Sequence, residues 1–228
     1  THIERARQKP RPFASGERMS AAADLGFIHR FIAGRETGKS PLLLLHGTGG
    51  DESDLVTLAE RITPGTTILA PRGKVLEHGM PRFFRRTSEG WDRDDLVART
   101  AELGDFLKRA REAYGIGKPI VLGYSNGANI AWSLMLKEPD ALAGAILMRA
   151  MLPFDPRPLP DLKDLPVLLL AGKYDELIPM TQAGLLAALL GESGADVTYE
   201  TLPAGHGLTE QDLKLATSWL ASRRMPHG

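Results

Sequence analysis

The stretch KPIVLGYSNGANIAWSLMLK, residues 118–137, combines an apolar run, a glycine-rich turn and a helical pattern. The first part reads as a strand that is covered on both faces, and residues 126–137 read as a helix. Between them Ser125 has Gly123 and Gly127 two places away on either side. A strand, tight turn and helix in this order predict a strained turn that raises the serine hydroxyl above the sheet. The alternative is an ordinary Gly/Ser turn, because a chain with 24 glycines contains such pentapeptides by chance.

The rest of the chain supplies the context that this turn requires. From about residue 27, short apolar runs alternate with longer helical patterns, which is typical of a mostly parallel sheet with helices on both faces. The run at 26–34 alternates and predicts a half-buried antiparallel strand. The other predicted strands are 41–46, 66–71, 118–124, 142–150, 165–172 and 195–202, and the predicted helices are 51–62, 91–115, 126–137, 181–194 and 209–224. The sequence therefore predicts one α/β domain with a central sheet of about seven strands.

Two long stretches, 72–91 and 151–164, fit neither pattern. Each follows a predicted strand and so leaves the sheet at its carboxyl edge, where open α/β sheets bind ligands. Loops of this length are usually functional or disordered. We interpret them as pocket walls, and the candidate pocket residues in and around this edge are Met80, Phe83, Met151 and Leu177.

A serine hydroxyl needs a base, and the base needs a group that orients it. Two histidines follow Ser125: His227 is the penultimate residue, whereas His206 lies in a glycine-flanked loop between the last strand and the last helix. His206 is the predicted base. Asp175, just after the strand at 165–172, is the predicted orienting acid because of its position and short side chain. Less favoured carboxylates are Glu176, Asp155, Asp161, Asp164 and Asp196.

Charge that develops on a substrate oxygen during attack requires two backbone N–H donors. One predicted donor is Asn126, which follows the serine at the start of a helix. The second is Thr48 in HGTGG (46–50), because the flanking glycines free the backbone to turn its N–H inward. His46 is predicted to brace this loop rather than to act on substrate.

Four motifs, LLLLHGTGG (42–50), GYSNGA (123–128), LLLAGKYDELIP (168–179) and PAGHGL (203–208), resemble those of the phospholipase/carboxylesterase family of α/β-hydrolases. The resemblance covers most of the chain after about residue 26. It implies a hydrolase fold with little or no cap and a Ser125–Asp175–His206 triad, with Thr48 and Asn126 binding the oxyanion. Acyl-protein thioesterases of this family typically carry Gln where this chain has Asn126. The chain is more similar to the bacterial carboxylesterase branch.

Composition narrows the possible partners. Lys plus Arg and Asp plus Glu both number 28, so no net charge recruits nucleic acid or an anionic membrane. There is no cysteine, hence no disulfide or thiolate metal site, and no metal or cofactor motif occurs. AGRETGKS (33–40) loosely resembles a phosphate loop, but Pro41 and a leucine strand follow it instead of a helix. No apolar run has the length of a membrane span, and the lack of cysteine is compatible with a cytoplasmic location.

These observations predict a flexible N-terminal arm over 1–25 and a catalytic domain over 26–224. The predicted activity is hydrolysis of small or short-chain carboxylic esters through an acyl-enzyme, without a cofactor. Two alternatives stay open: a lysophospholipase or acyl thioesterase with the same triad, and a non-catalytic binding protein on a hydrolase scaffold. The partner would be a small-molecule ester, and the sequence leaves open whether the protein is a monomer or a homodimer.

Overall fold

The computed structural model describes residues 25–223 except 37, 89, 153, 155 and 156, so the predicted arm lies outside the described residues save for Leu25. Leu25 is buried in the core, which extends the described domain by one residue at this end. In chain order the elements are β1 (His29–Ile32), β2 (Leu42–Leu45), α1 (Val56–Ile62), β3 (Ile68–Pro71), β4 (Val75–Glu77), β5 (Met80–Arg82), β6 (Arg86–Thr87), β7 (Gly90–Trp91), α2 (Arg93–Tyr114), β8 (Ile120–Tyr124), α3 (Asn126–Lys137), the 3-10 turn η1 (Pro139–Ala141), β9 (Gly144–Met148), β10 (Pro166–Gly172), α4 (Met180–Glu192), β11 (Asp196–Leu202) and α5 (Glu210–Ser222).

Seven strands form the central sheet in the order β1-β3-β2-β8-β9-β10-β11. β1 pairs with β3 antiparallel, and every other neighbouring pair in this sheet is parallel. The predicted sheet of about seven mostly parallel strands with one antiparallel strand is therefore confirmed. Strand β8, which leads to Ser125, lies in the middle of the sheet, so the loop after it is supported on both sides.

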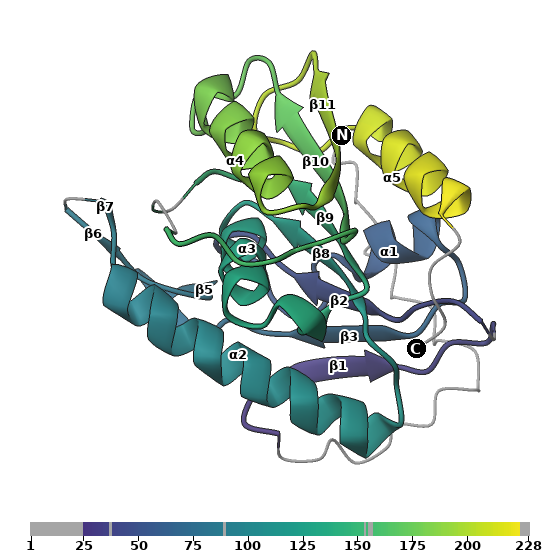
Figure 1. Ribbon diagram of the computed structural model, residues 1–228. Coiled ribbons are helices and arrows are strands. Elements are labelled where there is room, and N and C mark those ends of the chain that lie inside the picture. Colours follow the sequence, from purple (N-terminus) through teal and green to yellow (C-terminus); the bar gives the residue numbers. More distant parts are fainter. Residues whose placement is uncertain (1–24, 37, 89, 153, 155–156, 224–228) are drawn as a thin grey trace, which may run out of the picture.

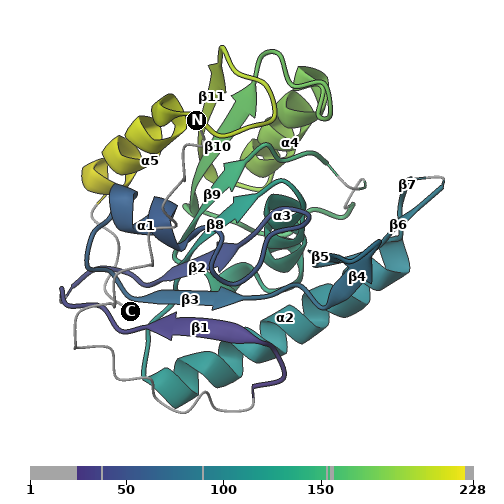
Figure 2. The ribbon, with the colours of Figure 1, turned by 180° about the vertical axis from the view of Figure 1, so that it is seen from behind.

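Helices cover both faces of the sheet, as the alternating pattern predicts. α2, α3 and α4 pack on one face, and α1 and α5 pack on the other (Figures 1 and 2). The leucines of β2 show why the strand is apolar throughout: Leu43 and Leu45 join the first core, while Leu42 and Leu44 join the second. Successive side chains of a strand point to opposite faces, so a doubly covered strand needs an unbroken apolar run.

Two segments differ from the sequence prediction. The predicted helix at 51–62 begins at Val56, because Asp51 turns the chain first: its Oδ1 accepts from the N–H of Ser53 at 2.8 Å. The stretch 72–91 is not irregular but holds the two small hairpins β4–β5 and β6–β7. Figure 1 shows the β6–β7 hairpin projecting beyond the N-terminal end of α2. No further helical layer covers the carboxyl edge of the sheet among the described residues.

Candidate active site

Ser125 occupies the turn between β8 and α3 in a conformation that L residues rarely adopt, with φ 53° and ψ −115°. Such a backbone costs about 1–3 kcal/mol and persists only where the surroundings enforce it. Here the surroundings are tight, because a Cβ added at Gly127 would lie 2.0 Å from the carbonyl oxygen of Leu45. The N–H of Ser125 donates to the Met148 carbonyl at 2.9 Å, which ties the turn to the end of β9.

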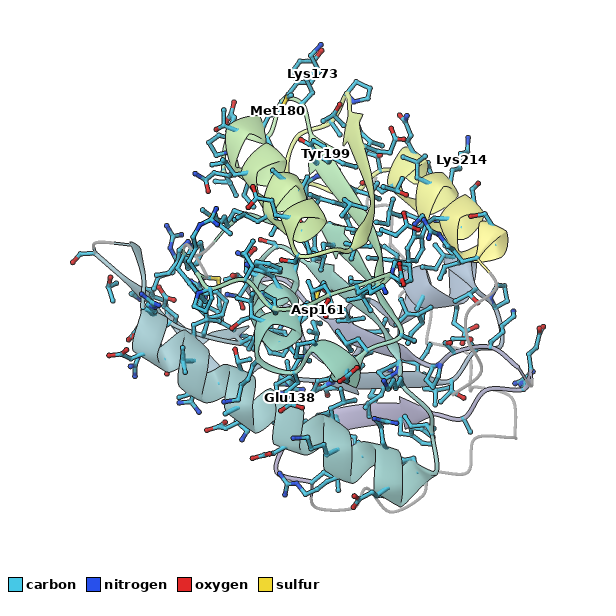
Figure 3. The ribbon with its side chains drawn as sticks, in the orientation of Figure 1. Glu138, Asp161, Lys173, Met180, Tyr199 and Lys214 are labelled. Atoms are coloured by element: carbon cyan, nitrogen blue, oxygen red, sulfur yellow. The ribbon has the colours of Figure 1, made fainter. Side chains whose placement is uncertain are left out.

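The structure brings Ser125, Asp175 and His206 together, although they are separated in the sequence. His206 Nε2 lies 3.0 Å from Ser125 Oγ, and His206 Nδ1 lies 2.9 Å from Asp175 Oδ2. The Asp175 side chain is 1% exposed and the His206 side chain 22%, so the acid is enclosed while the imidazole reaches solvent. The loop that carries Asp175 lies at the end of β10, between the positions labelled Lys173 and Met180 in Figure 3.

Asp175 is held by its own loop. Its Oδ1 accepts from the N–H groups of Leu177 at 2.9 Å and Ile178 at 3.0 Å, which leaves Oδ2 for His206. A carboxylate fixed in this way presents an acceptor to Nδ1, so the Nδ1 proton stays with the imidazole and Nε2 faces the serine as an acceptor.

The two predicted oxyanion donors lie where the loop after β2 meets the start of α3. Gly47 closes a turn by accepting from the N–H of Gly50 at 3.1 Å, and the Gly49 N–H donates to Pro81 at 2.9 Å. In the part of the chain that the structure describes, the N–H groups of Thr48 and Asn126 donate to no protein atom. The Asn126 side chain is used elsewhere, because its Oδ1 accepts from the Phe83 N–H at 2.8 Å.

His46 braces this loop, as its position suggested. It is 1% exposed; its Nδ1 donates to Gly47 O at 2.6 Å and its Nε2 accepts from the Gly73 N–H at 3.0 Å. Burial lowers the pKa of His46, so the ring is neutral and can be donor and acceptor at once. These bonds occupy both ring nitrogens and leave none for a substrate.

The four candidate pocket residues differ in their placement. Met80 is 44% exposed and lies against Gly49, with its Sδ 3.7 Å from the position of a Cβ there. Leu177 is 70% exposed beside Asp175, and Met151 is half-buried, with its N–H donating to Asn129 on α3 at 3.0 Å. Phe83 is 2% exposed and packs in the core against the His46 ring, so it supports the site from behind.

Two residues that contact the His206 loop, Tyr124 and Arg149, were not identified from the sequence. Tyr124 donates from its hydroxyl to the carbonyl of His206 at 3.1 Å, and burial raises the pKa of this phenol, which keeps it protonated as a donor. Arg149 donates to the carbonyls of Gly205 at 2.9 Å and Gly207 at 3.0 Å. An arginine inside the apolar run at 142–152 was the available signal, because a buried cation needs partners.

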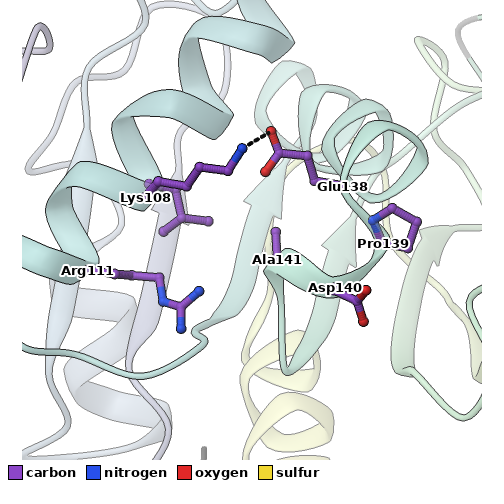
Figure 4. A pocket seen from close by; sticks show the side chains of 7 residues that line it. Lys108, Arg111, Glu138, Pro139, Asp140 and Ala141 are labelled. Carbon is purple, nitrogen blue, oxygen red and sulfur yellow. Dashed lines mark hydrogen bonds and ion pairs between the residues drawn. The ribbon is translucent and has the colours of Figure 1, made fainter.

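Two cavities of the described chain lie away from these groups. One of about 450 Å³ lies between α2, α3, Phe154 and residues 157–160. The other, of about 230 Å³, is at the amino edge of the sheet, where Lys108 Nζ lies 3.2 Å from Glu138 Oε1 (Figure 4). No member of the Ser125–Asp175–His206 group lines either cavity.

The described residues contain no helix long and apolar enough to cross a membrane. They also contain no cluster of three or more His, Asp or Glu side chains arranged to hold a metal ion.

Comparison with known proteins agrees with the fold. Residues 80–164 match the model of the α/β hydrolase fold family. The chain is 46% identical over 193 residues to MhqD of Bacillus subtilis (strain 168), a protein named as a hydrolase, covering 83% of this chain and 96% of that one.

Solved structures are similar over nearly the same span. The Bacillus cereus carboxylesterase superposes with a TM-score of 0.85 at 40% identity, covering 87% of this chain and 95% of that one. A carboxylesterase from Mesorhizobium loti gives a TM-score of 0.83 at 35% identity, with coverage of 88% and 97%. With the fold, the sequence identity and the structural similarity in agreement, this chain belongs to the α/β-hydrolase family, among proteins of the carboxylesterase type.

Proposed function

We propose that this hydrolase is a serine carboxylesterase that cleaves small or short-chain carboxylic esters through an acyl-enzyme. One observation carries the proposal: His206 lies between Ser125 Oγ, at 3.0 Å, and Asp175 Oδ2, at 2.9 Å. A nucleophile, a base and an orienting acid in this geometry are the requirements of covalent acyl transfer. The similarity to two carboxylesterases supports an ester as the substrate.

In the proposed reaction, Ser125 Oγ attacks the ester carbonyl carbon while its proton passes to His206 Nε2. The electron pair of the carbonyl π bond moves to the oxygen, which becomes the oxyanion of a tetrahedral intermediate. When that intermediate collapses, the C–O bond to the alcohol breaks and the alcohol leaves with the proton from His206. Water then attacks the acyl-enzyme with His206 as base, releasing the acid and free Ser125. Asp175 stays ionised throughout and stabilises the imidazolium.

The oxyanion would be bound by the backbone N–H groups of Thr48 and Asn126. Neither N–H group has a protein partner among the described residues, so both are available to a substrate oxygen. The start of α3 adds the positive end of its helix dipole at the same place. Losing one donor of this kind typically costs about 3–4 kcal/mol of transition-state stabilisation.

Substrate size follows from what surrounds the serine. The described chain adds two small hairpins at the carboxyl edge of the sheet, and the exposed side chains of Met80 and Leu177 flank the site. Apolar side chains at the rim without a deep enclosure favour small or short acyl groups over long chains. Met151 completes the proposed apolar wall, and Phe83 supports it from the core.

The experiment is hydrolysis of a series of p-nitrophenyl esters, from acetyl to long-chain acyl, by the wild type and Ser125→Ala. We expect activity to be highest for the short chains and to fall at least about 10⁴-fold in the variant. Ser88→Ala, a change at an exposed serine, is the matched control and should keep wild-type activity.

Other outcomes would change the conclusion. A maximum at long chains would favour lysophospholipids or thioesters as substrates of the same triad. Retention of activity in Ser125→Ala would remove the serine from the mechanism, and inactivity of the wild type on all chains would favour a binding protein.

A further inference from the structure

Three consecutive backbone carbonyls around His206 are each held by a side chain from a neighbouring strand end. Arg149 Nε donates to Gly205 O at 2.9 Å, Tyr124 Oη donates to His206 O at 3.1 Å, and Arg149 Nη2 donates to Gly207 O at 3.0 Å. Loop residues between a strand and a helix ordinarily turn such carbonyls to water. Here the loop is fixed immediately before, at and after the histidine.

Burial of the charged Arg149 side chain and its backbone conformation both oppose folding. Its side chain is 0% exposed, as is that of Asp212 on α5, with which it forms a bidentate pair at 2.7 and 3.0 Å. Its backbone also has φ 55°, the left-handed region that residues other than glycine rarely enter. A buried ion pair adds little net stability over an apolar pair of the same size. Stability alone therefore does not explain an arginine here.

The position of Arg149 connects all three loops of the proposed triad. The carbonyl of the preceding Met148 accepts from the N–H of Ser125 at 2.9 Å. The N–H of Arg149 donates at 2.9 Å to Leu170 on β10, the strand that leads to Asp175. The Arg149 side chain then reaches the loop of His206. Residues 148 and 149 at the end of β9 thus contact the serine turn, the strand of the acid and the histidine loop.

We propose that Arg149 and Tyr124 are positioning residues that set the His206 imidazole between Ser125 and Asp175. We call these two side chains, with their hydrogen bonds to the three carbonyls around His206, the clamp. The inference rests on the proposed esterase function, because it assigns the clamp to the base of that reaction. The imidazole must keep both hydrogen bonds at once, to Ser125 and to Asp175, and a displacement of about 1 Å at a reacting group costs about 100-fold in rate. A guanidinium suits the task because its donors serve three backbone carbonyls and both carboxylate oxygens of Asp212, five contacts in all, whereas an ammonium has only three N–H groups.

The first test compares Arg149→Lys with the double variant Arg149→Met/Asp212→Asn, using a short-chain ester. The double variant removes both charges, so that no unpaired ion is buried, and the amide oxygen introduced by Asp212→Asn can still accept from the Thr209 N–H at the start of α5. We expect kcat to fall about 100-fold in both variants, with KM within about threefold of wild type. A folded double variant with wild-type kcat would overturn the proposal.

The second test removes a single hydrogen bond. Tyr124→Phe should lower kcat about fivefold without a matching change in KM, since one hydrogen bond contributes about 1 kcal/mol and a tenfold change in rate corresponds to about 1.4 kcal/mol. Tyr199→Phe is the matched control: Tyr199 packs against the core on β11 (Figure 3), and its hydroxyl has no hydrogen-bond partner among the described residues. Equal kcat values for the two variants would contradict the clamp, even where an Arg149 variant does not fold.

A third readout does not depend on turnover. The proton on His206 Nδ1, which is hydrogen-bonded to Asp175 Oδ2, gives an imidazole N–H resonance far downfield in the NMR spectrum, identified by its loss in a His206→Ala variant. We expect it to shift or broaden in Tyr124→Phe and in the double variant, and to stay unchanged in Tyr199→Phe. An unchanged resonance in every variant would overturn the positioning role. If the wild type hydrolyses no ester, the esterase proposal fails while this spectrum still decides whether the clamp sets the imidazole.

Discussion

Asp175 uses its two carboxylate oxygens for different tasks, and this division makes its substitution informative. Oδ1 accepts from two backbone N–H groups of its own loop, and Oδ2 faces His206 Nδ1. An asparagine can keep the first pair of hydrogen bonds through its carbonyl oxygen. Its amide would then present a donor to Nδ1, which favours the tautomer with the proton on Nε2. That nitrogen could no longer accept the proton of Ser125.

We therefore predict that Asp175→Asn keeps the fold and lowers kcat by about 10⁴-fold, the loss typical of this change in such triads. The measurement is steady-state hydrolysis of a short-chain ester, with the melting temperature as a check on folding. Glu176→Gln is the matched control at the neighbouring, exposed carboxylate and should stay within about twofold of wild type. The reverse ranking of the two variants would assign the acid to Glu176.

His46 links the stability of the protein to pH. Burial lowers its pKa in the folded protein from 6.5, so the folded state binds this proton less readily than the unfolded chain does. Above pH 6.5 both states carry a neutral ring and the contribution of His46 is complete. As the pH falls below that value, the unfolded state takes up the proton first and the stability contribution is lost.

The prediction is that acidification from about pH 7.5 to about pH 5.5 destabilises the wild type more than His46→Asn, by on the order of 1 kcal/mol. His46→Asn should be the less stable of the two at the higher pH, because it loses the bonds to Gly47 and Gly73. Urea unfolding at both pH values gives the four free energies needed. The same pH dependence in both proteins would show that His46 is not the titrating group.

At the scale of the element, α3 meets β2 with no room for a side chain. A Cβ at Gly127 would lie 2.0 Å from Leu45 O and 2.6 Å from His46 O, both of them backbone atoms. Separation of the two elements would move the start of α3, with the Asn126 N–H, away from the loop that carries Thr48. The second glycine of the pentapeptide thus sets the distance between the proposed oxyanion donors.

Gly127→Ala should accordingly lower both the melting temperature and kcat, because backbone must shift to admit the methyl group. Gly184→Ala in α4 is the matched control: its Cβ would meet nothing within 4 Å, and alanine favours a helix over glycine by about 1 kcal/mol. Thermal unfolding and ester hydrolysis of both variants give the comparison. A stable, fully active Gly127→Ala would mean that the contact between α3 and β2 does not position the site.

At the scale of the whole molecule, the core reaches the first described residue. Leu25 is 6% exposed and joins the core that α2 covers, and the ring of Phe27 lies 4.9 Å from that of Phe106. Because of these contacts, we propose that the folding unit begins at Leu25.

We predict that a chain beginning at Leu25 keeps the melting temperature and activity of the full chain. For a chain beginning at Ile28, the free energy of unfolding should fall by at least about 2 kcal/mol, because it lacks the buried side chain of Leu25 and the ring of Phe27. Urea unfolding of both truncations and of the full chain measures the difference. A large loss in the first truncation would show that residues 1–24 contribute to the folded domain.

The sequence by itself determined the fold class, the strand order in the chain and the residues to examine. Apolar runs, helical periodicity and the turn around Ser125 are local signals, and local signals survive in a one-dimensional sequence. The bounds of α3 agree with the prediction to the residue. The order of serine, acid and histidine, each after its own strand, pointed to three residues that the structure then places within hydrogen-bonding distance.

Only the tertiary structure decided which side chains support that group. Arg149 contacts Gly205, Gly207 and Asp212, which follow it in the chain by 56, 58 and 63 positions. The periodicity of a sequence does not predict a contact over such a separation. Phe83 gave the pattern of a pocket residue but lies in the core, and the hairpins in 72–91 have strands of only two or three residues, too short to show alternation. Local pattern fixes which face of an element is apolar, whereas the partner of a buried charge depends on how distant elements pack.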